Sequence, residues 1–395
     1  MEQEDQKTIH SGQHFRPYRP MTSFSRRQLL HHLTIGGSAT IAAAAVTPHL
    51  SAQPLSQPSP ALDTITPQTW KLTSVWDPDS LFGRSLQRFV EQVGQQTQGL
   101  LELKLVTPPD PREALNQVSK GQVEMGQGLP LLWENQLPAA SYLMTIPFGL
   151  TATEQWLWLY QGGGQALADQ VYATVGCKYF PGGNLGFTAG GWFKAEVTGV
   201  NALAEITLQS SGLAAAVWQA FGAKVVTLAP AQMRQQLREG TIGAAEYVSP
   251  QQDLQIELHQ AAPFYYFPGW QRPGTLLDFF INLEAWNSLS PWLQASLEAA
   301  IVSFNQWFLN EQTFQNQQAL RSLLQQGIQM RSFPESVLLR LESITGELLQ
   351  ERSKTHPQVG EVLQSIIDFR ANLLPWIQQV EVGYLTARRW TWKLR

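Results

Sequence analysis

The stretch at residues 264–282 organises the chain, and it reads Phe-Tyr-Tyr-Phe-Pro-Gly-Trp-Gln-Arg-Pro-Gly-Thr-Leu-Leu-Asp-Phe-Phe-Ile-Asn. Its four opening aromatic residues suit a strand or the wall of a cleft. Two Pro-Gly pairs then bracket Trp270 and Arg272, and a β-type run, 276–283, leads away. A cation and an aromatic ring held between rigid turns are typical of a pocket that presents an anion-binding group. The alternative is a buried aromatic strand followed by a surface loop.

Length, charge and cysteine content narrow the class of protein. The chain has 395 residues, which is enough for two domains with sizeable cores. Its net charge is −4 and no basic stripe is visible, so nucleic-acid binding has no electrostatic support. The single cysteine, Cys177, excludes an intramolecular disulfide, and we expect it to be a small buried residue.

The N-terminal region predicts the compartment. Residues 25–30, Ser-Arg-Arg-Gln-Leu-Leu, form a twin-arginine signal, and a weakly apolar run follows at 33–46. That run is too short and too weak for a transmembrane helix. We therefore expect 1–52 to be a signal region that exports the folded protein to the periplasm, and 53–67 to be a Pro/Ser/Gln tether. An uncleaved amphipathic anchor is the alternative.

Hydrophobic periodicity predicts two α/β units. Strands at 70–76, 101–106 and 123–128 alternate with helices at 81–96 and 112–120. The same pattern recurs in strands 205–209, 224–228 and 244–248 and helices 213–221 and 231–239. Beyond residue 283 the chain reads as helical, with long segments at 291–326, 334–352 and 359–373. The fold class expected is α/β, with two lobes joined by hinge strands and a helical C-terminal region.

The expected division places ligand between the lobes. Residues 68–189 plus 248–283 would form the first lobe, and 190–247 plus 284–380 the second lobe with connecting helices. Residues 187–193 would be a strand crossing between the lobes, and 381–395 a basic aromatic tail. In such an architecture the ligand sits in the cleft between the lobes.

No catalytic signature is found in the sequence. It contains no Gly-x-Ser-x-Gly elbow, no His-Glu-x-x-His and no Cys-x-x-Cys. If the signal region is removed, His259 and His356 are the only histidines left, and surface or capping roles suit both. We therefore expect a binding protein and not an enzyme.

Four motifs carry a family resemblance. They are Ser-Val-Trp at 74–76, Pro-Phe-Gly-Leu at 147–150, Gly-Gly-Trp-Phe at 190–193 and Pro-Gly-Trp-Gln-Arg-Pro-Gly at 268–274. From about residue 70 to 352 the chain resembles the DctP-like extracytoplasmic solute-binding subunits of TRAP transporters, in the branch that binds α-keto acids and related monocarboxylates. The resemblance implies a two-lobe periplasmic binding protein fold, in which the lobes close on a ligand and deliver it to membrane permease subunits, with no reaction catalysed.

The departures from the family fall where ligand chemistry is expected. Leu208 stands at the position of an arginine that grips the substrate carboxylate, and Thr188 at that of a glutamine expected to touch substrate and metal. Tyr247 replaces a tryptophan. The family pattern Pro-Gly-Trp-His-Glu has a glutamate that the resemblance identifies as a metal ligand, and here that position is Arg272.

These changes suggest one exchange, in which a guanidinium replaces a metal site. A bound cation and Arg272 would repel each other, so we predict no family-type metal and no cofactor. Arg272 would instead reach the anionic ligand through a bidentate bond. Trp270, Tyr247, Trp76 and Trp192 would line the pocket, with Thr188 and Leu208 as further ligand-binding positions. The alternatives are a surface salt bridge for Arg272 and ordinary packing for the aromatic residues.

The predicted function is a periplasmic solute-binding protein of a TRAP-type transporter. It would capture a small organic anion, a monocarboxylate or α-keto acid-like compound, and deliver it to the permease. The alternative is a degenerate binding fold that acts as a structural or sensory partner, with altered or no ligand. Some relatives pair through long C-terminal helices, and the patterns at 291–326 and 359–373 permit a homodimer of this kind.

Overall fold

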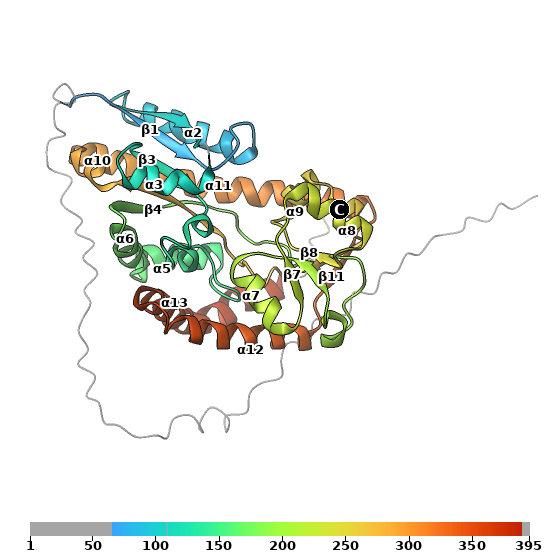
Figure 1. Ribbon diagram of the computed structural model, residues 1–395. Coiled ribbons are helices and arrows are strands. Elements are labelled where there is room, and N and C mark those ends of the chain that lie inside the picture. Colours follow the sequence, from blue (N-terminus) through green and yellow to red (C-terminus); the bar gives the residue numbers. More distant parts are fainter. Residues whose placement is uncertain (1–64, 109, 389–395) are drawn as a thin grey trace, which may run out of the picture. The chain divides into compact units, whose positions relative to one another are not determined.

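The computed structural model describes residues 65–108 and 110–388, which lie in one compact unit, Ser59–Arg395 (Figure 1). The predicted signal region, most of the tether and residues 389–395 of the predicted tail lie outside these ranges. In the described ranges, no helix has the length and apolar character needed to cross a membrane.

Five strands form the first sheet, in the order β2-β1-β3-β10-β4. They are β1 (Gln68–Ser74), β2 (Leu101–Val106), β3 (Met125–Gly128), β4 (Cys177–Asn184) and β10 (Leu276–Asn282). β1 pairs in parallel with β2 and β3, and helices α2 (Leu81–Gln96) and α3 (Ala114–Ser119) lie between these strands in sequence, as the βαβαβ pattern predicts. β10 is antiparallel to β3 and β4, so a late strand completes the sheet. We call this sheet with its helices the first lobe.

The local sequence explains the first unit. Ser80 caps α2, because its hydroxyl accepts a hydrogen bond from the backbone N–H of Gly83 at 3.0 Å. Leu86, Phe89 and Val93 recur at helical spacing and are buried against the sheet. The first four residues of β2 alternate between buried and exposed, which is the period-two pattern of a half-buried strand.

Six strands form the second sheet, in the order β11-β9-β5-β8-β6-β7. They are β5 (Gly191–Phe193), β6 (Thr207–Gln209), β7 (Lys224–Val226), β8 (Ala244–Ala245), β9 (Phe264–Phe267) and β11 (Gln329–Ser332). β6 is parallel to β7 and β8, and α7 (Gly212–Phe221) and α8 (Pro230–Glu239) connect the three. This repeats the arrangement of the first sheet, and we call it with its helices the second lobe.

The remaining helices cover and connect the two sheets. They are α4 (Ala140–Met144), α5 (Ala152–Gln161), α6 (Gly164–Ala173), α9 (Pro250–Gln255), α10 (Leu283–Ser288), α11 (Pro291–Gln325), α12 (Glu335–Arg352), α13 (Pro357–Trp376) and α14 (Gly383–Ala387). Short 3₁₀ turns are η2 (Pro111–Glu113), η3 (Pro130–Trp133), η4 (Val200–Leu203) and η5 (Leu258–Gln260), and η6 (Ile377–Val382) is a π-helical turn.

Several segments link the lobes. Residues 185–190 lead from β4 to β5, and residues 268–275 return from β9 to β10. Helix α11 packs on α2 and β4 of the first lobe and on α9, beside the second sheet. Helix α12 packs on α7, whereas α13 packs on α4, α5 and α6, so the turn between α12 and α13 is another crossing point.

The strand pairing corrects parts of the predicted division. Residues 264–267 belong to the second sheet, although we assigned all of 248–283 to the first lobe. Helix α13 packs on the first lobe, although we assigned 284–380 to the second. Within 187–193 only β5 is a strand. These pairings are long-range contacts, which local periodicity does not report.

Strand β4 was not predicted at all. It contains Pro181, Gly182 and Gly183, which local propensity treats as strand breakers. β4 lies at the edge of its sheet, where a proline is tolerated because one side of the strand needs no ladder bonds. The carbonyl of Pro181 accepts a hydrogen bond from the Asn305 amide of α11 at 2.7 Å. Cys177 at the start of β4 is buried, as expected from the sequence.

Asp278 is a buried carboxyl in the middle of β10. The Tyr172 hydroxyl donates a hydrogen bond to its Oδ2, and the Trp133 indole donates to that hydroxyl at 3.2 Å. Its Oδ1 has no hydrogen-bond partner in the described ranges of the chain. Burial raises the pKa of Asp278 well above its usual range.

We predict that Asp278→Asn flattens the dependence of stability on pH. The folded-state pKa lies above the unfolded value, so the stabilisation is complete below the unfolded pKa and declines as pH rises toward the folded one. The decline is about 1.4 kcal/mol per pH unit for one such group. Asparagine cannot ionise, so the variant should gain stability relative to the native protein from pH 4.5 to 8, measured by urea unfolding. A constant difference across this range would contradict the prediction.

Candidate functional site

The segment 268–275 is held tightly against the other crossing segment. A Cβ atom at Gly269 would lie 2.2 Å from the carbonyl oxygen of Thr188, so only glycine fits. The Thr188 hydroxyl donates a hydrogen bond to the Arg272 carbonyl at 2.9 Å. The Gln271 amide donates to the Ala189 carbonyl at 2.6 Å. The backbone that carries Arg272 is therefore fixed from both sides.

The Arg272 side chain is partly buried, and only part of its hydrogen-bonding capacity is used. Its Nη2 donates a hydrogen bond to the carbonyl oxygen of Tyr247 at 2.5 Å. Its Nε is buried and finds no acceptor in residues 65–108 and 110–388. A guanidinium is always charged, so a buried N–H without an acceptor calls for an anionic or polar partner.

A small cavity between the lobes adjoins Arg272. Its volume is about 20 Å³, room for about one water molecule. The lining residues come from three places: Leu131, Ser141, Met144 and Thr145 of the first lobe, residues 211–214 at the start of α7 in the second lobe, and Gln271 and Arg272 of the crossing segment.

Several polar groups at this cavity lack partners. The hydroxyls of Ser141 and Thr145 and the side-chain amide oxygen of Gln271 are buried without a hydrogen bond from the described residues. Ser211, the N-cap of α7, makes no side-chain capping bond, and a helix N-terminus favours a negative group. Two hydroxyl donors, one guanidinium N–H and a helix N-terminus together suit a carboxylate.

Two buried carboxylates act on the charge of Arg272. Glu246 accepts hydrogen bonds from the Ser210 hydroxyl and the Trp218 indole, both at 2.6 Å. Burial raises its pKa, and the positive charge of Arg272, with these two bonds, opposes that shift. Burial likewise lowers the pKa of Arg272, and Glu246 and Asp253 oppose this change.

Asp253 has three donors of its own. Its Oδ2 accepts from the Trp192 indole at 2.9 Å and from the Tyr265 hydroxyl at 2.8 Å, and its Oδ1 accepts from the backbone N–H of Val248 at 3.1 Å. Burial raises its pKa to about 6, against the effect of these bonds and of Arg272. Both carboxylates are thus held in place by neutral donors, with the guanidinium as their common cation.

The predicted aromatic residues pack around this region. Trp270 is 3% exposed and lies between Phe148 and Trp218, each 5.4 Å away between ring centroids. Trp192 is fully buried and stacks on Tyr265 at 4.0 Å. Within the described chain, neither tryptophan lines the Arg272 cavity. A ligand contact for these rings stays a prediction.

The other predicted site residues occupy different environments. Trp76 is partly buried, and its indole donates to the side-chain amide oxygen of Gln127 at 2.7 Å. Tyr247 is partly buried and contributes its backbone carbonyl to Arg272. Leu208 is 1% exposed and packs in the second-lobe core. The structure thus brings Arg272, Thr188 and Tyr247 together, and a ligand contact for Trp76 and Leu208 also stays a prediction.

Sequence reasoning missed the residues that complete the site. They are Ser141 and Thr145 on the first lobe, Gln271 beside Arg272, and the buried acids Glu246 and Asp253. Isolated serines, threonines and glutamines carry no local signal. Glu246 precedes the singled-out Tyr247, and a carboxylate at the end of a buried strand was the available clue.

The residues around Arg272 do not fit a metal ion. The described ranges contain no group of three or more His, Cys, Asp or Glu side chains placed to hold one. The oxygens of Glu246 and Asp253 already accept bonds from neutral donors. Two unit positive charges 4 Å apart repel by about 4 kcal/mol at a partly buried site, and a divalent ion by more.

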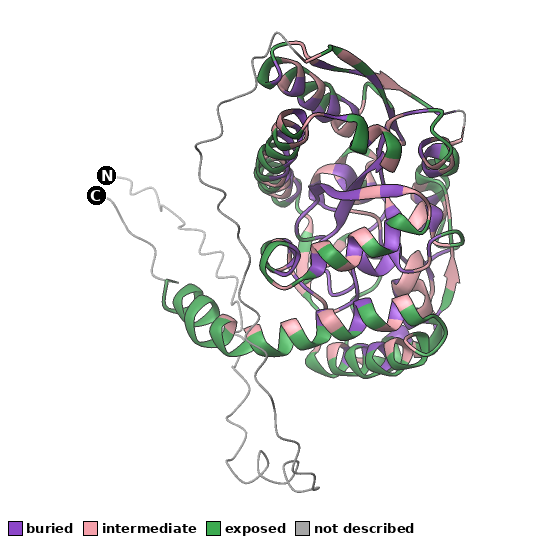
Figure 2. Cartoon of the chain, turned by 90° about the vertical axis from the view of Figure 1, so that its left-hand side faces the viewer, coloured by how far each residue is buried: buried purple, intermediate pink, exposed green. Residues whose placement is uncertain are grey.

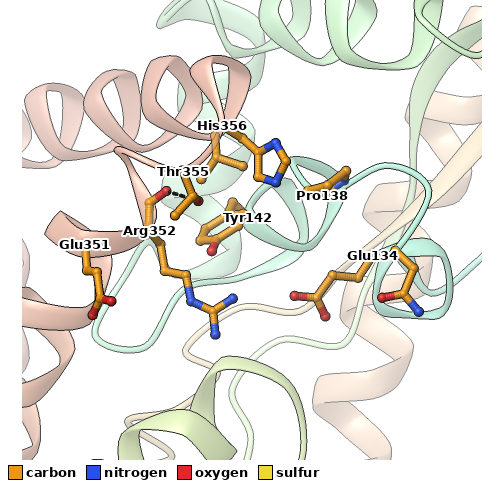
Figure 3. A pocket seen from close by; sticks show the side chains of 9 residues that line it. Glu134, Pro138, Tyr142, Glu351, Arg352, Thr355 and His356 are labelled. Carbon is orange, nitrogen blue, oxygen red and sulfur yellow. Dashed lines mark hydrogen bonds between the residues drawn. The ribbon is translucent and has the colours of Figure 1, made fainter.

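A larger pocket lies elsewhere, between α4 and the turn that joins α12 to α13 (Figure 3). Its volume is about 440 Å³. Figure 3 shows Arg352 reaching into it from the α12 side, with Glu134 opposite. Arg352 and His356 are exposed, and none of the lining residues in the described chain has a buried, unpaired side-chain atom. Size alone therefore does not make it the functional site.

Comparisons with known proteins place the chain among solute-binding proteins. The chain is 31% identical over 321 residues to a monocarboxylate 2-oxoacid-binding periplasmic protein of Nostoc sp., covering 80% of this chain and 87% of that one. It is 32% identical to a TRAP periplasmic solute-binding protein of Colwellia psychrerythraea solved with calcium and pyruvate, with a TM-score of 0.76 and coverage of 82% and 100%. A Pseudoalteromonas atlantica counterpart with sodium and pyruvate is 29% identical, with a TM-score of 0.74 and coverage of 81% and 99%.

Two α/β lobes, joined by crossing segments with unpaired polar groups between them, define a two-lobe solute-binding protein. The model of DctP, the bacterial extracellular solute-binding protein family 7, matches residues 72–355. The chain belongs to this family, whose members are solute receptors of TRAP transporters and not a class of enzymes.

We predict that Gly269→Ala disturbs the site by displacing the crossing segment. The added methyl group would meet backbone that cannot move aside, so unfolding free energy should fall by about 1–3 kcal/mol in urea titrations. Gly346→Ala is the matched control. Gly346 lies on the exposed face of α12 with open space around it, and alanine there should stabilise by about 0.5–1 kcal/mol. Equal effects would show that the Thr188 contact is not tight.

Proposed function

We propose that this protein captures a small monocarboxylate, of the 2-oxo acid type, in the cavity beside Arg272 and delivers it to a TRAP permease. The observation that carries the proposal is the set of unpaired groups there: the Arg272 Nε and the Ser141 and Thr145 hydroxyls. Groups from both lobes contribute, so a ligand that satisfies them would hold the lobes together.

The lining favours one charge and a short apolar part. Among the residues that line the cavity, Arg272 is the one cation, and Leu131, Met144 and Leu213 supply apolar contact. A second carboxylate would be buried without a counter-charge, which disfavours dicarboxylates. The cavity of about 20 Å³ is smaller than any organic acid, so the lobes must open or shift to admit the ligand.

The relatives support the ligand class. The Nostoc relative is named for monocarboxylate 2-oxo acid binding, and the two marine relatives were solved with pyruvate. The Gln271 side-chain amide oxygen, Oε1, accepts hydrogen bonds but cannot donate one, so a water molecule bound beside the acid suits it better than a second oxyanion would.

We predict that Arg272→Ala weakens binding of pyruvate or a longer 2-oxo acid by about 10- to 100-fold, because a hydrogen bond to a charged group is lost. Arg272→Lys should bind with intermediate affinity, because it keeps the charge but not the planar fork. Isothermal titration calorimetry on the purified mature protein measures both.

Arg234→Ala is the control for this experiment. Arg234 pairs with Glu257 on the second lobe and does not line the cavity, so its loss should leave affinity unchanged. Equal affinity of native protein and Arg272→Ala would remove Arg272 from the site. A native protein that binds none of a panel of mono- and dicarboxylates would favour the degenerate, sensory or structural role instead.

We further propose that the protein reaches the periplasm by the twin-arginine pathway, and residues 25–30 support this route.

We also propose that the protein pairs with a second copy through its C-terminal helices. This pairing is supported by exposed apolar side chains along α13, η6 and α14: Ile367, Leu374, Trp376, Val380, Val382, Tyr384 and Leu385. Figure 2 shows much of this region as exposed. Apolar surface of this extent on one helix is typical of an interface.

We predict that Trp376→Glu combined with Tyr384→Glu converts a dimer to a monomer. Buried glutamates would cost more than the interface supplies. Light scattering coupled to size exclusion measures the mass. Leu339→Glu, on the exposed face of α12, should leave it unchanged. A native protein that is monomeric at micromolar concentration would exclude the dimer.

A further inference from the structure

We propose that Arg272 occupies the place of a metal ion, so that this protein binds its acid without calcium or sodium. The inference deepens the proposed function and rests on it for the identity of the ligand. It concerns the charge arrangement of Glu246, Arg272 and Asp253, which holds whether or not pyruvate is the natural ligand.

The two acids behave as counter-charges and not as metal ligands. Each is buried, and each accepts at least two hydrogen bonds from uncharged groups. Indole, hydroxyl and backbone donors hold both carboxylates in place, and the positive charge that acts on both of them is the Arg272 guanidinium.

The guanidinium itself is positioned as a permanent cation. It is anchored by one bond, from Nη2 to the Tyr247 carbonyl, while Nε is buried and has no acceptor from the described chain. Its backbone is fixed through Thr188 and Gly269. A mobile surface arginine would show neither feature.

Solved relatives show that a cation can accompany the ligand in this fold. One holds calcium with pyruvate and another sodium with pyruvate. In the present protein the positive charge at the cavity belongs to a side chain of the protein itself, Arg272. Ligand uptake would then be insensitive to the calcium and sodium content of the surroundings.

Metal binding is tested first without any acid present. The native protein is treated with EDTA, exchanged into choline buffer and then given calcium chloride or sodium chloride. Its melting temperature should stay within about 1 °C in each case. Arg272→Glu removes the cation and adds a carboxylate, so calcium should raise its melting temperature by several degrees. If that variant does not fold, Arg272→Gln is used, for which calcium should again stabilise more than it does the native protein.

Ligand binding is tested second, with pyruvate as the probe. Its dissociation constant for the native protein should agree within about twofold between EDTA–choline buffer and buffers with calcium or sodium. A melting shift of native protein with either metal, or a tenfold loss of pyruvate affinity on metal removal, would overturn the inference. So would a folded Arg272→Glu or Arg272→Gln protein with no calcium response.

These results separate the inference from the proposed function. If native protein ignores metals but binds no organic acid under any condition, the proposed ligand class fails and the cation replacement stands. If it binds pyruvate only with calcium present, the function stands and the replacement fails.

Discussion

A positive charge that is partly buried must be matched by negative charge and by hydrogen-bond acceptors, and this requirement shapes the centre of the molecule. The negative charge that acts on Arg272 comes from Glu246, which follows β8, and from Asp253 in α9. Those acids in turn require donors, which are Trp218, Ser210, Trp192 and Tyr265. Three aromatic side chains of this region, Trp218, Trp192 and Tyr265, are therefore linked to Arg272 through the acids to which they donate.

The two crossing segments transmit this arrangement to both lobes. Residues 185–190 and 268–275 bind each other through Thr188, Gly269 and Gln271, and each leads from one sheet to the other. The cavity lies beside this junction and is lined by residues of both lobes, so a ligand bound there would contact both. A receptor that reports its loaded state to a permease needs such contacts.

Much of the fold was predictable, because segments with strong hydrophobic periodicity indicate their own secondary structure. Helix 81–96, strand 101–106 and the paired βαβαβ units were all predicted, and a long helix at 291–326 was confirmed as α11 with an end one residue earlier. The misses have local causes. β4 carries Pro181 and two glycines yet forms an edge strand, and β11 is four residues long within a mostly helical region. Their pairing partners lie far away in sequence, so only tertiary contact reveals them.

The sequence alone determined the family, the two-lobe α/β class and the prominence of Arg272, because motif order and the Pro-Gly brackets are local properties. Only the tertiary structure decided what surrounds that arginine. Ser141 and Thr145 come from one stretch of the chain and Glu246 and Asp253 from another, and Trp192 is a donor to Asp253 in a packed core. Their roles depend on burial and distance, and both arise when the lobes fold around the guanidinium.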